Sequence, residues 1–141
     1  MKRSGSAIWT GGIKDGSGRV STESGALDDI GYSFAKRFGD EAGTNPEELI
    51  GAAHAACFSM ALSGALGEAG MKAEEIATSS TVTISPADGG FAIPEVHLTV
   101  TARIPGADEA AFMKAAEGAK SGCPVSKVLN AKITMDAKLV N

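Results

Sequence analysis

The sequence has few cysteines, no excess of positive charge and no long hydrophobic run. Thirteen basic and 17 acidic residues give a net charge of −4, so the chain lacks the basic footprint that nucleic-acid binding requires. No apolar run approaches the roughly 18–20 residues of a membrane span, and no apolar segment follows the basic N-terminus. We therefore expect a cytoplasmic protein with no nucleic-acid or membrane partner.

Only two cysteines are present, Cys57 and Cys123. Because cytosolic thiols stay reduced, a lone structural disulfide is not the first expectation. The remaining composition is ordinary for a globular protein, with 43% hydrophobic and 21% charged residues. A length of 141 residues predicts a single domain, residues 1–141, with one good core.

Early glycines and a long apolar helix organise the first half of the chain. Tight glycine turns predict short strands at residues 7–10, 19–24 and 32–38. Asn45 as N-cap and Pro46 at the first helical position predict a helix that runs to about residue 69, with Gly70 as its stop. This helix is apolar on nearly all sides, which predicts burial all round. One sheet of so short a chain covers only part of it, so we expect a second copy of the chain to cover the rest.

Alternating strands and an amphipathic helix follow. Residues 76–85 and 91–104 predict two strands joined by a turn at residues 88–90. Residues 108–120 predict an amphipathic helix, residues 125–129 a short helical turn, and residues 132–139 a last strand. Strands, helix, hairpin, helix and strand in this order predict an α+β fold with a largely antiparallel sheet.

The two cysteines carry the first functional hypothesis. Cys57 lies in the middle of the apolar helix, where a free cysteine often only fills space. Cys123 precedes Pro124, which places its sulfur near a helix N-cap, and the N–H groups there favour a thiolate. Two such thiols suit reversible disulfide chemistry, in which one attacks an electrophile and the other resolves the product.

A thiolate needs a nearby cation. Arg19 and Arg37 are the candidates, although a solvated surface arginine is the more common outcome for either. Glu47 stands ten residues before Cys57, roughly 15 Å along one straight helix, so it cannot touch that sulfur in its own helix. It either complements the helix dipole or, if two such helices pack antiparallel in a dimer, approaches Cys57 of the other chain.

Three other classes compete with a redox enzyme. His54, His97 and the cysteines suggest zinc only weakly, because no CxxC or HxxxH spacing is present. A satisfied core histidine is the stronger interpretation of His54, and no orienting partner supports it as a base for Cys57. A thiol hydrolase lacks a placed His and Asp to complete a triad. A non-catalytic redox-sensing disulfide protein also stays open.

The chain resembles the OsmC/Ohr family, and the OsmC branch in particular. Its residues 43–60, GTNPEELIGAAHAACFSM, resemble the family signature, and residues 122–126, GCPVS, resemble the second cysteine motif. Residues 20–25, VSTESG, and residues 34–38 resemble the OsmC branch. The Ohr branch has a Gly-Gly-Arg stretch where this chain has Gly-Gly-Ile at residues 11–13, which favours Arg37 over Arg19.

The resemblance implies an OsmC-like fold with antiparallel sheets around a long buried helix, in an intertwined homodimer with active sites at the subunit interface. It implies a thiol peroxidase that reduces organic hydroperoxides and, less efficiently, hydrogen peroxide. Cys57 takes the peroxidatic role and Cys123 the resolving role, while Arg37 and Glu47 form the family's ion pair. No metal or other cofactor is implied. The resemblance suggests a lipoyl-type dithiol as reductant. We further expect an apolar lining that includes Phe38, Phe58 and Met60 and favours organic peroxides over hydrogen peroxide.

Overall fold

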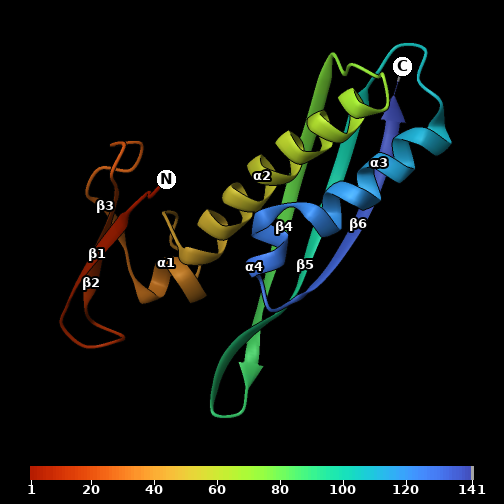
Figure 1. Ribbon diagram of the computed structural model, residues 1–141. Helices are drawn as coiled ribbons and strands as arrows, with labels where there is room; N and C mark the ends of the chain where they lie inside the picture. The colour runs from red at the N-terminus through yellow and green to blue at the C-terminus, as the bar shows by residue number, and fades with distance from the viewer. Residues whose placement is uncertain (141) are drawn as a thin grey trace. The chain divides into compact units, whose positions relative to one another are not determined.

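The computed structural model describes residues 1–140, which form two compact units. The first unit is Met1–Leu49, and the second begins at Ile50. The elements of the first unit are β1 (Gly5–Thr10), β2 (Ser17–Thr22), β3 (Ile30–Tyr32) and α1 (Phe34–Phe38), followed by the start of α2 (Pro46–Glu68). Its three strands form an antiparallel sheet in the order β1-β2-β3 (Figure 1).

Residues 34–38 form a helix, so the predicted strand at residues 32–38 is wrong beyond Tyr32. The reason is local capping. The Ser33 hydroxyl accepts a hydrogen bond from the Lys36 N–H at 3.2 Å, and the Ser33 carbonyl accepts one from the Arg37 N–H at 3.1 Å. Serine at an N-cap favours a helix start over the alternating pattern that the side chains suggested.

Helix α2 begins and ends where the sequence predicts. The Asn45 side chain accepts a hydrogen bond from the Glu48 N–H at 2.8 Å, which satisfies one of the free donors at the helix start. At the other end Gly70 takes a positive φ of 75°, and the Met71 N–H bonds back to the Leu66 carbonyl at 2.8 Å. This is the left-handed stop that glycine permits.

The second unit contains a three-stranded sheet covered by helices. Its elements are the main part of α2, β4 (Glu75–Ala87), β5 (Gly90–Arg103), α3 (Glu109–Gly122), α4 (Pro124–Val128) and β6 (Lys132–Val140). The strand order is β4-β5-β6, in which β4 pairs antiparallel with β5 but β6 pairs parallel with it. The sheet is therefore less uniformly antiparallel than expected, because α3 and α4 form a crossover that returns the chain in the direction of β5.

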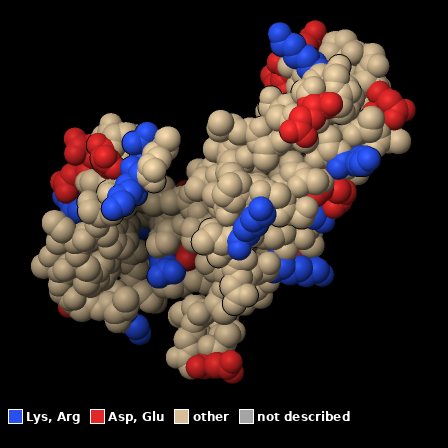
Figure 2. Space-filling model, in the orientation of Figure 1, with Lys and Arg blue, Asp and Glu red and all other residues tan. Residues whose placement is uncertain are grey.

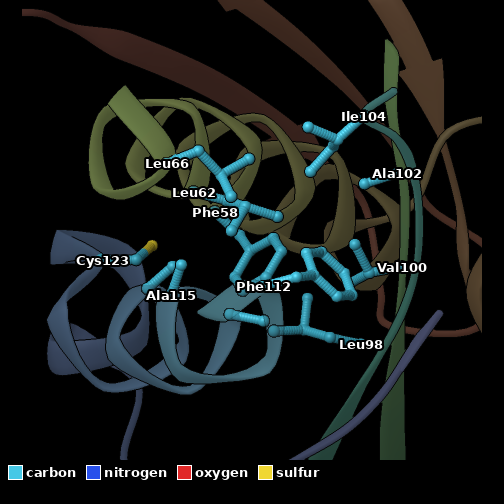
Figure 3. Packing of buried hydrophobic residues seen from close by; sticks show 12 residues of the cluster. Phe58, Leu62, Leu66, Leu98, Val100, Ala102, Ile104, Phe112, Ala115 and Cys123 are labelled. Carbon is cyan, nitrogen blue, oxygen red and sulfur yellow. The ribbon is translucent and has the colours of Figure 1, made fainter. Parts of the chain in front are cut away.

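The core of the second unit lies between α2, α3 and the inner face of β5. Figure 3 shows the aromatic rings of α2 and α3 packed against the β5 side chains. The cluster consists of Phe58, Leu62, Leu66, Leu98, Val100, Ala102, Ile104, Phe112, Ala115, Ala116, Ala119 and Cys123. The expected α+β class is confirmed.

One face of α2 is exposed in the single chain. His54, Phe58, Leu62 and Leu66 recur every four residues and are fully buried, whereas Met60 on the other side is 78% exposed. In Figure 2 the surface along the middle of this helix is tan, and charged side chains gather near its C-terminal end. One chain therefore does not bury α2 all round, so the expected burial would require a second molecule.

By length and composition α2 is apolar enough to cross a membrane, contrary to the expectation from the sequence. Its many alanines make it apolar on average although no continuous, strongly apolar run is present. The core helix of a soluble protein passes the same test. Since α2 packs its leucines and Phe58 against the sheet and α3, we interpret it as a core helix.

Candidate active site

The two cysteines meet between α2 and the start of α4. Cys57 lies near the middle of α2 and is half-buried, whereas Cys123 is completely buried. Their sulfur atoms are 2.9 Å apart, and both thiols are free. Figure 3 shows Cys123 at the margin of the core, beside Ala115. Residues that are 66 positions apart in the sequence are thus within reach of a disulfide after small side-chain movements.

Helix geometry fixes the position of Cys123. The residue ends α3, where its N–H bonds to the Ala119 carbonyl at 2.9 Å, and it is also the N-cap of α4. Pro124 at the first position of α4 forces the chain to turn between the two helices. The predicted N-cap position of Cys123 is confirmed.

The surroundings of the two thiols shift their pKa values in opposite directions. Burial raises the pKa of Cys57, and its hydrogen bond with Cys123 adds to this rise. The hydrogen bond from the Val125 N–H lowers the pKa and offsets part of the rise. Burial also raises the pKa of Cys123, but the hydrogen bonds from Cys57, from the N–H and hydroxyl of Ser126 and from the Val125 N–H outweigh it and lower the pKa overall. The sulfur makes no regular side-chain cap, so these N–H groups act by lying close to it rather than by ideal geometry.

No lysine or arginine is among the groups that shift the pKa of Cys57 within residues 50–140. A buried thiol without a neighbouring cation is a poor nucleophile, because the thiolate is the reactive form. The sulfur pair is therefore poised to form a disulfide, but it lacks the charge that would activate Cys57.

Arg37 and Glu47 form an ion pair within the first unit. The Arg37 Nη2 donates to Glu47 Oε1 at 2.7 Å, and Nε donates to both carboxylate oxygens at 3.1 and 3.2 Å. Glu47 lies in the first turn of α2 and is only 8% exposed. The guanidinium also lies 5.0 Å from the centre of the Phe38 ring. Nη1 has no hydrogen-bond partner within residues 1–140, so it can donate to a ligand.

Arg19 has a different partner. Its Nη1 donates to the Asp29 carbonyl at 2.9 Å and lies 3.5 Å from the Asp29 carboxylate, and both side chains are mostly exposed. The structure therefore pairs Glu47 with Arg37, the arginine that the family resemblance favours, and leaves Arg19 in a surface contact.

The sulfur pair and the ion pair belong to different compact units. Cys57 and Cys123 lie in residues 50–140, whereas Arg37 and Glu47 lie in residues 1–49. Ten residues of one helix separate Glu47 from Cys57, which corresponds to about 15 Å along its axis. Glu47 therefore does not contact the sulfur of its own helix.

His54 is the core histidine that the sequence favours, but it has partners that the sequence did not reveal. Its Nδ1 lies 3.1 Å from the Ser80 hydroxyl and its Nε2 lies 2.7 Å from the Ser126 hydroxyl. The expectation that His54 lacks an orienting partner is wrong. The sequence held one signal that concerns this contact. Ser126 stands three residues after Cys123, the N-cap of α4, and a side chain at that position lies near the cap residue.

Two other sequence candidates lie apart from the cysteines. His97 is on the outer face of β5, where it contacts Thr134 and Asp136 at 2.6 and 3.2 Å. Across residues 1–140 no group of three or more His, Cys, Asp or Glu side chains is arranged to hold a metal ion. Phe58, which we expected to line the site, lies in the core instead.

Comparison with known proteins identifies the family. A family model described as OsmC-like protein matches residues 39–138. The chain belongs to the OsmC-like family. Peroxiredoxin OsmC from Escherichia coli (strain K12) is 53% identical over 139 residues, which cover 99% of this chain and 97% of the relative. Organic hydroperoxide resistance protein OhrB from Bacillus subtilis (strain 168) is 30% identical over 124 residues, or 86% of this chain and 88% of the relative.

Solved structures share the fold. An organic hydroperoxide resistance protein from Elizabethkingia anophelis superposes with a TM-score of 0.71 at 27% identity, and the match covers 100% of this chain and 98% of that one. An OsmC-like protein from Mycoplasma pneumoniae has a TM-score of 0.76 at 19% identity, covering 100% and 99%, which shows the fold alone. These similarities confirm the expected family and fold, and the names agree with the expected thiol-dependent peroxidase.

Proposed function

We propose that this chain is a cysteine-dependent peroxidase that reduces organic hydroperoxides and, less efficiently, hydrogen peroxide. The observation that carries the proposal is the 2.9 Å separation of the two free sulfur atoms on different elements. The names of the relatives, peroxiredoxin OsmC and organic hydroperoxide resistance protein, support the same class.

The reaction needs only sulfur. The Cys57 thiolate attacks the terminal oxygen of the hydroperoxide, the O–O bond breaks, and the alkoxide takes a proton and leaves as an alcohol. The resulting sulfenic acid is attacked by Cys123, the S–O bond breaks, and water leaves as the disulfide forms. An external dithiol then reduces that disulfide by exchange and is itself oxidised to a disulfide.

The exposure of the two cysteines supports the proposed division of roles. Cys57 is half-buried and can meet a substrate, whereas Cys123 is completely buried and can reach only its neighbour. We expect Cys57→Ser to abolish peroxide consumption, while Cys123→Ser completes one attack and then stalls as the sulfenic acid. Normal turnover by Cys57→Ser would overturn the proposal. Single oxidation of the wild type without steady-state turnover on any dithiol would favour the redox-sensing alternative.

Arg37 is the proposed activator of Cys57, and Glu47 holds its guanidinium in place. A bidentate carboxylate contact fixes the guanidinium plane and leaves Nη1 to donate to the thiolate or the peroxide. Arg37→Ala should raise the pH midpoint for alkylation of Cys57. Arg19→Ala is the matched control. It removes a positive charge from the same unit, but that charge is paired with Asp29 rather than with Glu47. Equal alkylation profiles for Arg37→Ala and wild type would remove Arg37 from the site.

The ion pair acts in this proposal on the cysteine of a partner copy. Glu47 lies about 15 Å along α2 from Cys57 of its own helix, and the uncharged exposed face of α2 around Met60 suits a second α2. We therefore propose a homodimer whose active sites lie at the subunit interface, each with sulfur atoms from one chain and the ion pair from the other.

Subunit mixing tests this arrangement. Cys57→Ser and Arg37→Ala are each expected to be inactive, but a mixed dimer contains one site with both an intact cysteine and an intact arginine. Random exchange between symmetric dimers should restore about a quarter of the wild-type sites. Absence of any recovery, with mixed dimers shown to form, would contradict the shared site.

The proposed substrate and reductant follow from the chemistry of the site and from the family resemblance. Apolar side chains near the ion pair and near Cys57, Phe38 and Met60, favour an organic hydroperoxide over hydrogen peroxide. A lipoyl-type dithiol is the proposed reductant, and the cytoplasm, where thiols stay reduced, is the proposed location. The ratio of kcat/KM for cumene hydroperoxide to that for hydrogen peroxide, measured with dihydrolipoate and with dithiothreitol, tests both assignments.

A further inference from the structure

A buried chain of hydrogen bonds ends at Cys123 and is not used by the mechanism above. It runs from the Ser80 hydroxyl on β4 to Nδ1 of His54 on α2, and from Nε2 of His54 to the Ser126 hydroxyl on α4. His54 is completely buried and Ser126 is 8% exposed. Ser126 is the third residue after Cys123, the N-cap of α4, and hydrogen bonding from its hydroxyl is among the causes that lower the pKa of the Cys123 thiol. The chain therefore joins a strand and two helices to the buried thiol.

The backbone is built to permit this contact. At Gly51, one turn before His54, an added Cβ would lie 2.7 Å from the Ser80 carbonyl oxygen, so only glycine lets α2 approach β4 this closely. Ser126 is the third residue of α4 after its N-cap, Cys123, and its side chain therefore lies beside the cap residue. Both ring nitrogens of His54 are thus held by side chains whose positions the fold fixes.

The position of the proton on the imidazole decides which groups donate and which accept in this series of hydrogen bonds. Burial lowers the pKa of His54, so the ring is neutral at physiological pH and carries one N–H. With that hydrogen on Nε2, the ring donates to Ser126 Oγ, and the Ser126 hydroxyl is left to donate to sulfur. Nδ1 then accepts from the Ser80 hydroxyl. With the hydrogen on Nδ1 the Ser126 hydroxyl would instead donate to the ring and be lost to the sulfur.

We propose that His54 is a positioning residue for Cys123: its imidazole orients the Ser126 hydroxyl so that this hydroxyl donates a hydrogen bond to the Cys123 thiolate. The inference rests on the resolving role proposed for Cys123. A stabilised Cys123 thiolate serves both halves of that role. It is the form that attacks the Cys57 sulfenic acid, and it is the better leaving group when an external dithiol attacks the Cys57 sulfur of the disulfide.

The other ionisable groups around Cys123 do not provide this stabilisation. Cys57 on α2 is the titratable group in direct contact with it. On α3, Lys120 is paired with Glu117 at 2.9 Å, and on α4, Lys127 is exposed. Within residues 50–140, no lysine, arginine, aspartate or glutamate is among the groups that shift the pKa of Cys123.

Titration of Cys123 alone tests the proposal. In full-length protein carrying Cys57→Ser, the ultraviolet absorbance of the thiolate reports the ionisation of Cys123 across pH. His54→Asn keeps an amide near the Nδ1 position but cannot reach Ser126, whereas His54→Gln keeps one near Nε2. Ser126→Ala removes the donor itself. Ser59→Ala is the matched control, because Ser59 bonds Thr78 at 2.8 Å across the same α2–β4 contact without reaching Cys123.

We expect Ser126→Ala and His54→Asn each to raise the midpoint by about one pH unit, the tenfold change that loss of a hydrogen bond to a charged group produces. His54→Gln and Ser59→Ala should leave it in place, and Ser126→Ala combined with His54→Asn should add nothing further. An unchanged midpoint in His54→Asn, or an equal rise in Ser59→Ala, would overturn the proposal.

If His54→Asn does not fold, Ser80→Ala tests the same link. Loss of the Ser80 hydroxyl removes the donor that keeps Nδ1 free of a proton, so the midpoint should again rise, and an unchanged midpoint would count against His54. The titration uses neither peroxide nor dithiol. A protein with full peroxidase activity and no shift refutes this inference alone, whereas a shift in a protein without peroxidase activity refutes only the proposed function.

Discussion

Oxidation of the two thiols should stabilise the protein without rearranging it. The sulfur atoms are 2.9 Å apart, and a disulfide bond measures about 2.05 Å, so they need to approach by only about 0.9 Å. Rotation of the two side chains supplies this movement, and the backbones of α2 and α4 can stay in place. The oxidised protein should therefore keep the circular dichroism spectrum of the reduced one.

The size of the stabilisation follows from the separation of the cysteines in the chain. A cross-link between residues 66 positions apart removes conformational entropy from the unfolded chain worth roughly 4 kcal/mol. For a chain of 141 residues this corresponds to a rise in Tm of about 10 °C.

Thermal unfolding after one equivalent of cumene hydroperoxide measures the effect. Reduced and oxidised samples are compared at the same protein concentration, because the Tm of the proposed homodimer would depend on concentration. Cys123→Ser treated in the same way is the control and should show no rise. Mass spectrometry should locate the Cys57–Cys123 linkage within one chain. A disulfide that forms but leaves Tm unchanged or lower would refute the conclusion that the folded chain already holds the two sulfur atoms in place.

Three further perturbations test other parts of the structure. Phe58→Ala should lower the free energy of unfolding by about 3–5 kcal/mol in urea titrations, since Phe58 is completely buried in the core; a loss below 1 kcal/mol would contradict that packing. Met60→Asp should dissociate the proposed homodimer into monomers in light scattering, whereas Lys114→Asp on the exposed side of α3 should not; a dimer that survives Met60→Asp would exclude this face of α2 as the interface. Burial lowers the pKa of His54 in the folded state, so the unfolded state binds the proton first and stability should fall as pH drops below about 6.5. His54→Gln should flatten that slope between pH 5 and 7 by about one proton, and an unchanged slope would mean that other groups cause it.

Local signals in the sequence predicted most of the elements correctly. Asn45 and Pro46 marked the start of α2, Gly70 marked its end, and the alternation of Val96, Leu98 and Val100 marked the inner face of β5. These features depend on residues close together in the chain, so no knowledge of the tertiary fold was needed. The same locality explains the error at residues 34–38, where an apparent alternation competed with the Ser33 cap and the cap prevailed.

The direction of β6 could not be read from its residues. Its alternating pattern fits a strand with one buried face in either orientation. Only the crossover through α3 and α4 decides that it pairs parallel with β5.

The features of the candidate active site also divide into those that the sequence determines and those that the tertiary structure decides. The sequence by itself determined the family, the two cysteines and the spacing of Glu47 from Cys57, because motif and spacing are properties of the chain. Tertiary structure alone decided that the two sulfur atoms are 2.9 Å apart, that the Arg37 guanidinium meets Glu47 through both Nε and Nη2, and that His54 bonds Ser126. Each of these contacts joins residues on different elements, and their distances depend on how helices and strands pack, which no local pattern encodes.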